Sequence, residues 1–238
     1  MTHSPSTPTA PIMGISRHRL STDGRGVTTL VGLHGCTLHC HYCLNDKCHT
    51  HLGVKHTISA TELYNIVCQD DIYFRSTGGG ITFGGGEPAM HSLFIEEFAR
   101  LNKMGWNITL ETSLNTPAHH IERLAPIIDD YIIDIKSLNP TIYRLYTGQA
   151  IEPVLHNLQY LIAQGKGPHI TVRTPLIPGY NTPQDVADST AKLREMGVVN
   201  IDSFTYRTDL SQRPKPDGKH GKSTCNVLKK IRTIIAEA

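Results

Sequence analysis

The stretch Gly35-Cys-Thr-Leu-His-Cys-His-Tyr-Cys-Leu-Asn45 carries three cysteines in the spacing C-x3-C-x2-C. Iron–sulfur clusters are held by cysteine thiolates, and a cubane cluster offers four irons for ligation. Three closely spaced thiols, those of Cys36, Cys40 and Cys43, can hold three corners and leave one iron open. An open iron can take a chelating ligand that is not part of the protein. The loop therefore predicts a [4Fe–4S] cluster with one iron free for such a ligand.

Zinc is the main alternative for this loop, because structural zinc sites take four Cys or His ligands in a tetrahedron. Zinc sites usually repeat a close pair of ligands further along the chain, and no second pair follows here. Six cysteines in 238 residues, with no secretory segment, do not indicate a disulfide framework. The cluster is favoured over zinc, although a fourth zinc ligand is available from His34, His39, His41, Cys48 or His49.

Length and composition indicate one globular domain. The chain is long enough for a sizeable core, and 39% apolar with 18% charged residues is ordinary for a globular protein. A net charge of +2 is too small to indicate nucleic-acid binding, and no run of about 18 apolar residues predicts a membrane span. Residues 1–14, rich in Ser, Thr and Pro, are predicted to be a disordered tail. Residues 15–238 are predicted to form a single domain in the cytoplasm, where thiols stay reduced.

Six strand-like segments alternate with helical ones. One helix is marked by the capping box Ser59-Ala-Thr-Glu62, and another begins at Thr182-Pro183. This alternation predicts a parallel sheet of right-handed βαβ units. Six units are too few for a closed eight-stranded barrel, so we expect an α/β fold with an open (β/α)6 TIM-type barrel. The predicted strands are 27–33, 81–83, 107–113, 131–136, 169–176 and 200–207, and further helices are predicted over 118–127 and 157–164.

Polar groups stand at the carboxyl ends of all six strands, where ligands bind in such sheets. The cysteine loop follows the first strand, and Gly84-Gly-Gly-Glu-Pro88 follows the second, where missing side chains let the backbone approach a ligand. Taken alone, these glycines are equally typical of a tight turn, and a buried Asp–Lys pair is commonly structural. Their convergence predicts one site, to which the later strands contribute Glu111, Thr112, Asp134, Lys136, Arg173, Tyr206 and Arg207.

Four further segments carry a family resemblance together with the cysteine loop. They are Asp23-Gly-Arg-Gly26, Gly85-Gly-Glu-Pro88, Tyr131-Ile-Ile-Asp-Ile-Lys136 and Val172-Arg-Thr-Pro-Leu-Ile-Pro-Gly179. With them the sequence resembles the glycyl radical enzyme activating enzymes of the radical S-adenosylmethionine (SAM) superfamily, of the pyruvate formate-lyase activating type. The family patterns are D-G-P-G, G-G-E-P, D-[IL]-K and R-x3-[VI]-P-G, and Arg25 stands where proline is usual.

The resemblance implies the cofactors and their residues. Cys36, Cys40 and Cys43 would hold the [4Fe–4S] cluster, whose open iron would take the amino and carboxylate groups of SAM. The family also has a monovalent cation beside SAM, and Glu111, Thr112 and Asp134 align with its ligands, with glutamate where aspartate is frequent. The remaining cofactor-binding residues implied by the resemblance are Tyr42, Leu44, Gly85, Gly86, Glu87, Asp134, Lys136, Arg173 and Arg207.

The resemblance also implies an oxidoreductase of anaerobic metabolism. An electron from flavodoxin or ferredoxin would cleave SAM, and the 5′-deoxyadenosyl radical would take the Cα hydrogen of a glycine in a partner glycyl radical enzyme. No catalytic residue is implied beyond the cluster and SAM, and the protein would be a monomer. Histidine is frequent at the position of Arg207. Residues 45–80 hold too few cysteines for a ferredoxin-like insertion, and Cys48, Cys68 and Cys225 are predicted to be structural thiols.

Two other functions remain open on the sequence. One is a radical SAM enzyme acting on a small molecule, similar to the 7-carboxy-7-deazaguanine synthases. The segments around Asp134-Ile-Lys136 and Pro178-Gly179 favour the activating enzyme over it. The other is a non-catalytic module stabilised by zinc, which would leave the converging strand ends unexplained.

Overall fold

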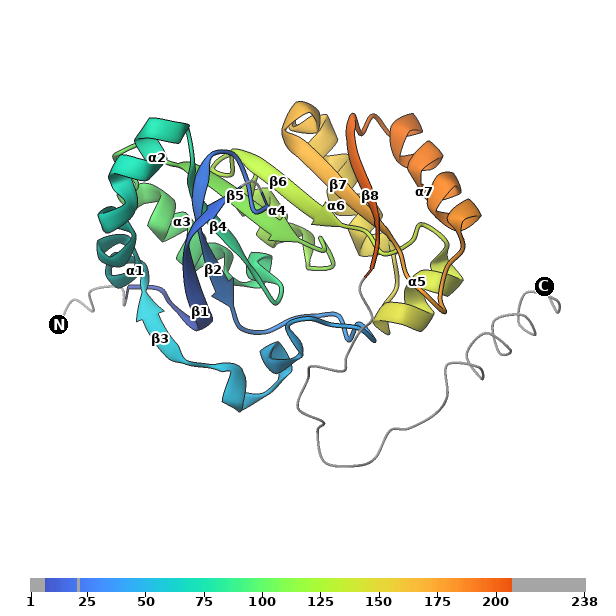
Figure 1. Ribbon diagram of the computed structural model, residues 1–238, viewed down its shortest axis with the longest axis horizontal. Helices are drawn as coiled ribbons and strands as arrows, with labels where there is room; N and C mark the ends of the chain where they lie inside the picture. Colours follow the sequence, from blue (N-terminus) through green and yellow to red (C-terminus); the bar gives the residue numbers. More distant parts are fainter. Residues whose placement is uncertain (1–6, 21, 207–238) are drawn as a thin grey trace.

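The computed structural model describes residues 7–20 and 22–206 of the chain. This part forms one eight-stranded sheet in the order β3-β1-β2-β4-β5-β6-β7-β8 (Figure 1). Pairing is parallel from β2 through β8 and antiparallel for β1 with β2 and β3. The strands are β1 Thr9–Leu20, β2 Val27–Leu33, β3 His56–Ser59, β4 Gly80–Gly85, β5 Asn107–Thr112, β6 Asp130–Asp134, β7 Ile170–Leu176 and β8 Asn200–Thr205.

Six parallel strands, β2 and β4 to β8, confirm the predicted open (β/α)6 arrangement. In the described part of the chain, β3 and β8 are the two ends of the sheet and do not pair with each other. Each parallel connection carries at least one helix, as a right-handed crossover requires. The helices are α1 Ala60–Val67, α2 Asp71–Thr77, α3 Ser92–Leu101, α4 Ala118–Leu124, α5 Pro140–Thr147, α6 Glu152–Ala163 and α7 Pro183–Glu195.

Local signals in the sequence fix several of these helix ends. Ser59 and Glu62 form the predicted capping box of α1, and Thr182 forms an equivalent box with Asp185 at α7. The Asn139 side chain accepts the Thr141 and Ile142 amides at the start of α5, which ends at Gly148 in the left-handed region. Figure 1 shows α1, α2 and α3 toward one end of the curved sheet and α5 and α7 toward the other.

The strands alternate between an apolar outer side and a polar inner side, as side chains do along a pleated strand. Fully buried apolar side chains from β2, β4, β5, β6 and β7 pack against the helices in one continuous core. The intervening positions face the concave side and are mostly polar residues or glycine, with Leu30 and Ile132 as apolar exceptions. At the carboxyl edge this side ends in Glu111, Asp134 and Arg173. The fold therefore brings polar groups from separate strands to one mouth.

The prediction of a disordered tail over residues 1–14 is wrong from Thr9 onward, because β1 begins there. Ala10 and Ile12 are buried, and β1 pairs with both neighbours. Alternating apolar side chains and two strand partners thus outweigh the local Ser/Thr/Pro composition. The sequence patterns also missed β3, α2 and α5. The predictions for Arg207 and Cys225 lie outside the described residues.

None of the helices in the described ranges is long and apolar enough to cross a membrane.

Candidate active site

A cavity of about 320 Å³ lies at the carboxyl edge of the parallel strands. It collects residues from the cysteine loop, from the glycine turn after β4 and from the ends of β5 to β8. This convergence of distant segments is what the strand-end pattern predicted. The lining residues are Cys36, Leu38, Cys40, Cys43, Leu44, Asn45, Gly85, Gly86, Glu111, Thr112, Ser113, Asp134, Lys136, Arg173, Phe204 and Tyr206.

Backbone hydrogen bonds join the cysteine loop to the glycine turn. The Glu87 amide donates to the Gly35 carbonyl at 2.7 Å, and the Gly86 amide donates to the Leu33 carbonyl at 2.9 Å. A Cβ on Gly86 would lie 2.0 Å from the Gly35 carbonyl oxygen, so only glycine allows this approach. The Asn45 side chain closes the contact by donating to the Gly85 carbonyl at 2.8 Å. The two loops are therefore held in one fixed relation.

The cysteine loop is also held on its other side, by α5. The His39 amide donates to the Thr147 carbonyl at 2.9 Å, and the His41 amide donates to the Tyr146 carbonyl at 3.2 Å. These carbonyls are at the end of a helix, where backbone acceptors lack intrahelical partners. The loop therefore satisfies the end of α5 while presenting its cysteines to the cavity.

The three thiols differ in their environment. Burial raises the pKa of Cys40 to about 12. A hydrogen bond from the Cys48 thiol lowers the pKa of Cys43 to about 6. The same neighbour lowers the pKa of Cys36, and the two contacts together with burial raise the pKa of Cys48. Two of the three thiols are thus stabilised as thiolates, the form that binds a metal.

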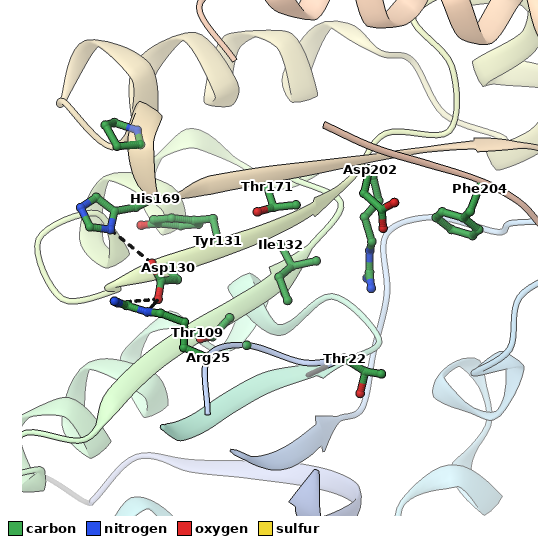
Figure 2. Close-up of a pocket in the computed structure, with 13 residues that line it drawn as sticks. Thr22, Arg25, Thr109, Asp130, Tyr131, Ile132, His169, Thr171, Asp202 and Phe204 are labelled. Atoms are coloured by element: carbon green, nitrogen blue, oxygen red, sulfur yellow. Dashed lines mark hydrogen bonds and ion pairs between the residues drawn. The ribbon is translucent and has the colours of Figure 1, made fainter. Parts of the chain in front are cut away.

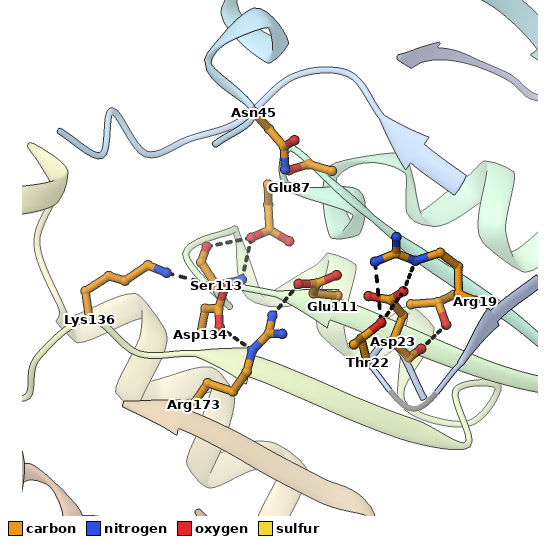
Figure 3. Close-up of polar contacts among 12 residues, drawn as sticks. Arg19, Thr22, Asp23, Asn45, Glu87, Glu111, Ser113, Asp134, Lys136 and Arg173 are labelled. Atoms are coloured by element: carbon orange, nitrogen blue, oxygen red, sulfur yellow. Dashed lines mark hydrogen bonds and ion pairs between the residues drawn. The ribbon is translucent and has the colours of Figure 1, made fainter. Parts of the chain in front are cut away.

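Four charged side chains form a network along the cavity wall (Figure 3). Arg173 donates to Asp134 at 2.7 Å and also pairs with Glu111. Lys136, which is 9% exposed, pairs with Asp134 at 3.3 Å. Lys136 and Arg173 lower the pKa of Asp134 against the effect of burial, whereas burial dominates at Glu111 and raises its pKa. The two positive and two negative charges balance, which is how buried charges are tolerated.

Glu87 does not line the cavity. Its carboxylate is completely buried and accepts the Ser113 amide at 2.9 Å and the Ser113 hydroxyl (Figure 3). The Thr112 hydroxyl also donates to this carboxylate. It also accepts the Ala89 amide at 3.2 Å, which starts the short 3-10 helix η4 (Pro88–His91). Burial still raises its pKa. The glutamate of the glycine turn therefore ties β4 to the end of β5.

Some of the remaining predicted cofactor-binding residues line the cavity, and others do not. Leu44, Gly85 and Gly86 line the cavity with the three cysteines and the charged network. Tyr42 does not: it packs against Tyr146 and Tyr180, and its carbonyl accepts the Tyr206 hydroxyl at 3.0 Å. The cation site stays a prediction, since Glu111 and Asp134 here share one guanidinium and the Thr112 hydroxyl donates to Glu87.

Sequence patterns missed Ser113, Leu38 and Phe204, which also line the cavity. Ser113 directly follows Thr112 at the end of β5, and this position was a usable signal for it. Leu38 lies inside the cysteine loop but is apolar and 3% exposed, like an ordinary core residue.

A second cavity, of about 650 Å³, lies further down the concave side and shares Arg173 and Phe204 with the first (Figure 2). Arg25 pairs there with Asp130 at 2.8 Å, and His169 contacts the same carboxylate at 3.2 Å. Arg25 is the residue that stands in place of the family's proline. Its guanidinium links the loop before β2 to Asp130 at the start of β6.

The chain matches the family model of the radical SAM superfamily over residues 30–193. The chain belongs to the radical SAM superfamily. It is 32% identical to the pyruvate formate-lyase 2-activating enzyme of Escherichia coli K12 over 72% of this chain and 68% of that one. It is also 32% identical to the indoleacetate decarboxylase activating enzyme of Tractidigestivibacter scatoligenes, over 61% of this chain and 50% of that one. The predicted resemblance to the activating enzymes is confirmed.

Solved structures of radical SAM proteins share the fold. A radical SAM methyltransferase from Sphaerobacter thermophilus superimposes with a TM-score of 0.58 at 18% identity, over 99% of this chain and 76% of that one. At this identity the likeness speaks for the fold alone. Radical SAM enzymes use a [4Fe–4S] cluster and SAM, so the cofactor prediction is confirmed at the level of the superfamily.

The donor set of this chain fits such a cluster. Three thiols from one loop line a single cavity, next to glycines whose bare backbone leaves room for a ligand. Within residues 7–20 and 22–206, no three His, Cys, Asp or Glu side chains converge as a single metal ion would require. Ligands spread around the corners of a cluster suit this arrangement better than the tetrahedron of one zinc ion.

Proposed function

We propose that this chain is an activating enzyme that installs a radical on a glycine of a partner glycyl radical enzyme. One observation carries the proposal: the three loop thiols, the glycine turn and the charged ends of β5, β6 and β7 meet in one cavity. The same segments carry the motifs of the activating-enzyme family, and the chain is 32% identical to the E. coli pyruvate formate-lyase 2-activating enzyme. When bound, the cluster and SAM supply the electron and the hydrogen-abstracting group of this chemistry.

The protein's part is to bind and orient these groups. Cys36, Cys40 and Cys43 hold the cluster, and the backbone of Gly85 and Gly86 lies against the methionyl end of SAM. Their amides and carbonyls can approach closely because no side chain intervenes. The cysteine loop and glycine turn are tied together, so the cluster and the methionyl group are held in a fixed relation. Fixing reacting groups in this way lowers the entropic part of a barrier.

The charged network binds the rest of SAM. Lys136 and Arg173 provide positive charge for the carboxylate, and Asp134 and Glu111 provide acceptors for the ribose hydroxyls. The network is already balanced internally, so binding exchanges some of these contacts for contacts to SAM. We also propose the monovalent cation beside Glu111, Thr112 and Asp134, and an Arg207 contact to the adenine side.

The partner and the reductant follow from this role. The protein substrate is a glycyl radical enzyme, and the electron donor is a flavodoxin or a ferredoxin. We propose that the chain acts as a monomer in the cytoplasm, where thiols and a reduced cluster persist. The relatives' names identify different partner enzymes, so the surface loops of this chain set its own choice.

The test is anaerobic reconstitution with iron and sulfide, followed by EPR spectroscopy of the dithionite-reduced protein with and without SAM. We expect a reduced-cluster signal that changes when SAM is added. We also expect a glycyl radical doublet on a co-expressed glycyl radical enzyme. The Cys40→Ala variant is the matched control, since it should fold but bind no cluster. A changed cluster signal without any doublet would instead favour a small-molecule substrate, and stoichiometric zinc without a cluster would refute the proposal.

A further inference from the structure

Tyr206 directly follows β8 and joins this end of the sheet to the cysteine loop. Its amide donates to the Leu176 carbonyl of β7 at 2.8 Å, which anchors its backbone to the sheet. Its hydroxyl donates to the Tyr42 carbonyl at 3.0 Å, across 164 positions of the chain. The cysteine loop follows β2, and four strands lie between β2 and β8 in the sheet. Strand pairing alone therefore does not fix the loop relative to β8, and the Tyr206 side chain supplies a direct contact.

The ring of Tyr206 lies beside the ammonium group of Lys136. The Lys136 Nζ is 5.5 Å from the centre of this ring and 3.3 Å from the Asp134 carboxylate. An ammonium group is attracted to an aromatic face, and more strongly where water is excluded. Lys136 is 9% exposed, and both it and Tyr206 line the cavity. Asp134 and Tyr206 thus both constrain the position of the positive charge in the cavity wall.

The Tyr206 side chain is itself supported by an aromatic cluster. Tyr146 and Ile177 are fully buried there, Tyr180 is nearly so, and both Tyr42 and Tyr206 pack against them. The ring centre of Tyr42 is 6.2 Å from that of Tyr146 and 5.8 Å from that of Tyr180. Tyr206 and the tyrosine of the cysteine loop therefore share one packed support, so that neither ring turns freely.

We propose that Tyr206 is a positioning residue for SAM, whose hydroxyl holds the cysteine loop at Tyr42 and whose ring holds the Lys136 ammonium group at the cavity wall. Tyr42 stands between Cys40 and Cys43, so a contact to its carbonyl restrains the segment that carries two cluster ligands. One side chain thereby sets the cluster side of the cavity relative to the charged side. The inference rests on the proposed function only in that a cluster and SAM occupy this cavity.

The experiment compares the wild-type protein with three variants of the full-length chain. Tyr206→Phe removes the hydroxyl and keeps the ring, whereas Tyr206→Leu removes both. Tyr180→Phe is the matched control, because Tyr180 belongs to the same aromatic cluster but does not line the cavity. The measurements are hydrogen–deuterium exchange of the apoprotein, urea unfolding, and the SAM dissociation constant of the reconstituted protein from equilibrium dialysis.

In the apoprotein, we expect faster exchange in the cysteine loop of Tyr206→Phe. The amides of His41 and Cys43 are hydrogen-bonded in the wild type. Peptides that contain them should exchange about fivefold faster, the factor expected for the loss of one hydrogen bond that keeps the loop closed. Peptides that contain the Gly86 and Glu87 amides should exchange at the wild-type rate, because the glycine turn keeps its own bonds to Leu33 and Gly35.

The SAM dissociation constant should rise in a defined order. In Tyr206→Phe it should rise by about the same factor of five, because only molecules with the loop in position bind SAM. In Tyr206→Leu it should rise about tenfold or more, since Lys136 also loses its aromatic contact. Tyr180→Phe should match the wild type in both measurements.

Three results would overturn the inference. Unchanged exchange and unchanged SAM affinity in Tyr206→Phe would show that the hydroxyl does not hold the loop. Equal dissociation constants in Tyr206→Phe and Tyr206→Leu would remove the role of the ring. A lower free energy of unfolding with unchanged SAM affinity in both variants would make Tyr206 a purely structural residue. The proposed function would fail separately, through wild-type protein that binds SAM but forms no glycyl radical doublet on the partner.

Discussion

Arg173→Gln removes the one guanidinium that pairs with both Glu111 and Asp134. The side chains of Arg173, Glu111 and Asp134 are 20%, 23% and 26% exposed, so all three are mostly withdrawn from water. Removing one partner of a buried ion pair costs about 3–5 kcal/mol. The residual exposure and the remaining Lys136 contact to Asp134 favour the lower end of that range, about 3 kcal/mol. For a chain of this length, this free-energy change corresponds to a fall of about 6–12 °C in Tm.

The loss should depend on pH in a defined direction. Burial already raises the pKa of Glu111 against the opposing effect of Arg173, so removing Arg173 should raise that pKa further. A carboxyl group with a raised folded-state pKa binds more protons in the folded than in the unfolded state, so stability falls as pH rises. Asp134 loses the partner that, with Lys136, lowers its pKa in the wild type. The destabilisation should therefore be largest near pH 8 and shrink as the pH falls through the raised pKa of Glu111.

Urea unfolding followed by circular dichroism at pH 8 and pH 5.5 measures both effects. Arg25→Gln is the matched control, because Arg25 also pairs with a concave-side carboxylate, Asp130, but its side chain is 63% exposed. An exposed pair of this kind contributes only about 0–1 kcal/mol. Equal losses in the two variants, or a loss in Arg173→Gln that does not change with pH, would refute the reasoning.

Three further predictions concern the loops around the cavity. Glu87→Ala should lower the free energy of unfolding by about 3 kcal/mol or more in urea titrations, because the donors from Ala89, Thr112 and Ser113 lose their buried acceptor. Glu87→Gln should lower it less, and equal losses in the two variants would argue against Glu87 acting as the buried acceptor. In the anaerobic apoprotein at pH 7.5, iodoacetamide should modify Cys43 well before Cys40, since their thiol pKa values are about 6 and about 12; peptide mapping showing the reverse order would contradict these environments. Gly86→Ala should reduce SAM binding in equilibrium dialysis, because its Cβ would collide with the Gly35 carbonyl. Gly14→Ala should not, because its Cβ would approach only the Lys55 Nζ, at 3.8 Å.

The sequence predicted the site better than it predicted the edges of the fold. The alternation of strands and helices predicted parallel strands, and parallel strands have their carboxyl ends at one edge of the sheet. The polar residues that follow Val27–Leu33, Gly80–Gly85 and Asn107–Thr112 were therefore expected to lie close together. No local pattern predicted β1, which pairs with β2, the next strand along the chain, and also with β3, which lies beyond the cysteine loop. Non-local pairing is the part of a fold that short-range patterns do not contain.

Side-chain direction was the second limit. Glu87 belongs to a motif whose glycines line the cavity, yet its carboxylate is directed toward Thr112 and Ser113. Cys48 has no motif partner, and its backbone contacts to Gly35 and Asn45 depend on the short 3-10 helix η1 (Asp46–His49), which returns it to the loop. Both residues lie next to recognised motifs in the sequence, but their contacts are set by how the chain turns back on itself.

The loops of this site are organised by the fold before any cofactor binds. Gly35 carries hydrogen bonds on both sides, to Glu87 through its carbonyl and to Cys48 through its amide. Backbone hydrogen bonds thereby join the start of the cysteine loop to both the glycine turn and η1, and join the middle of the loop to the end of α5. The conformational entropy of ordering this loop is thus offset by backbone bonds and not by the cluster. For this reason the loss of one ligand thiol should cost the cluster but leave the sheet and the loop in place.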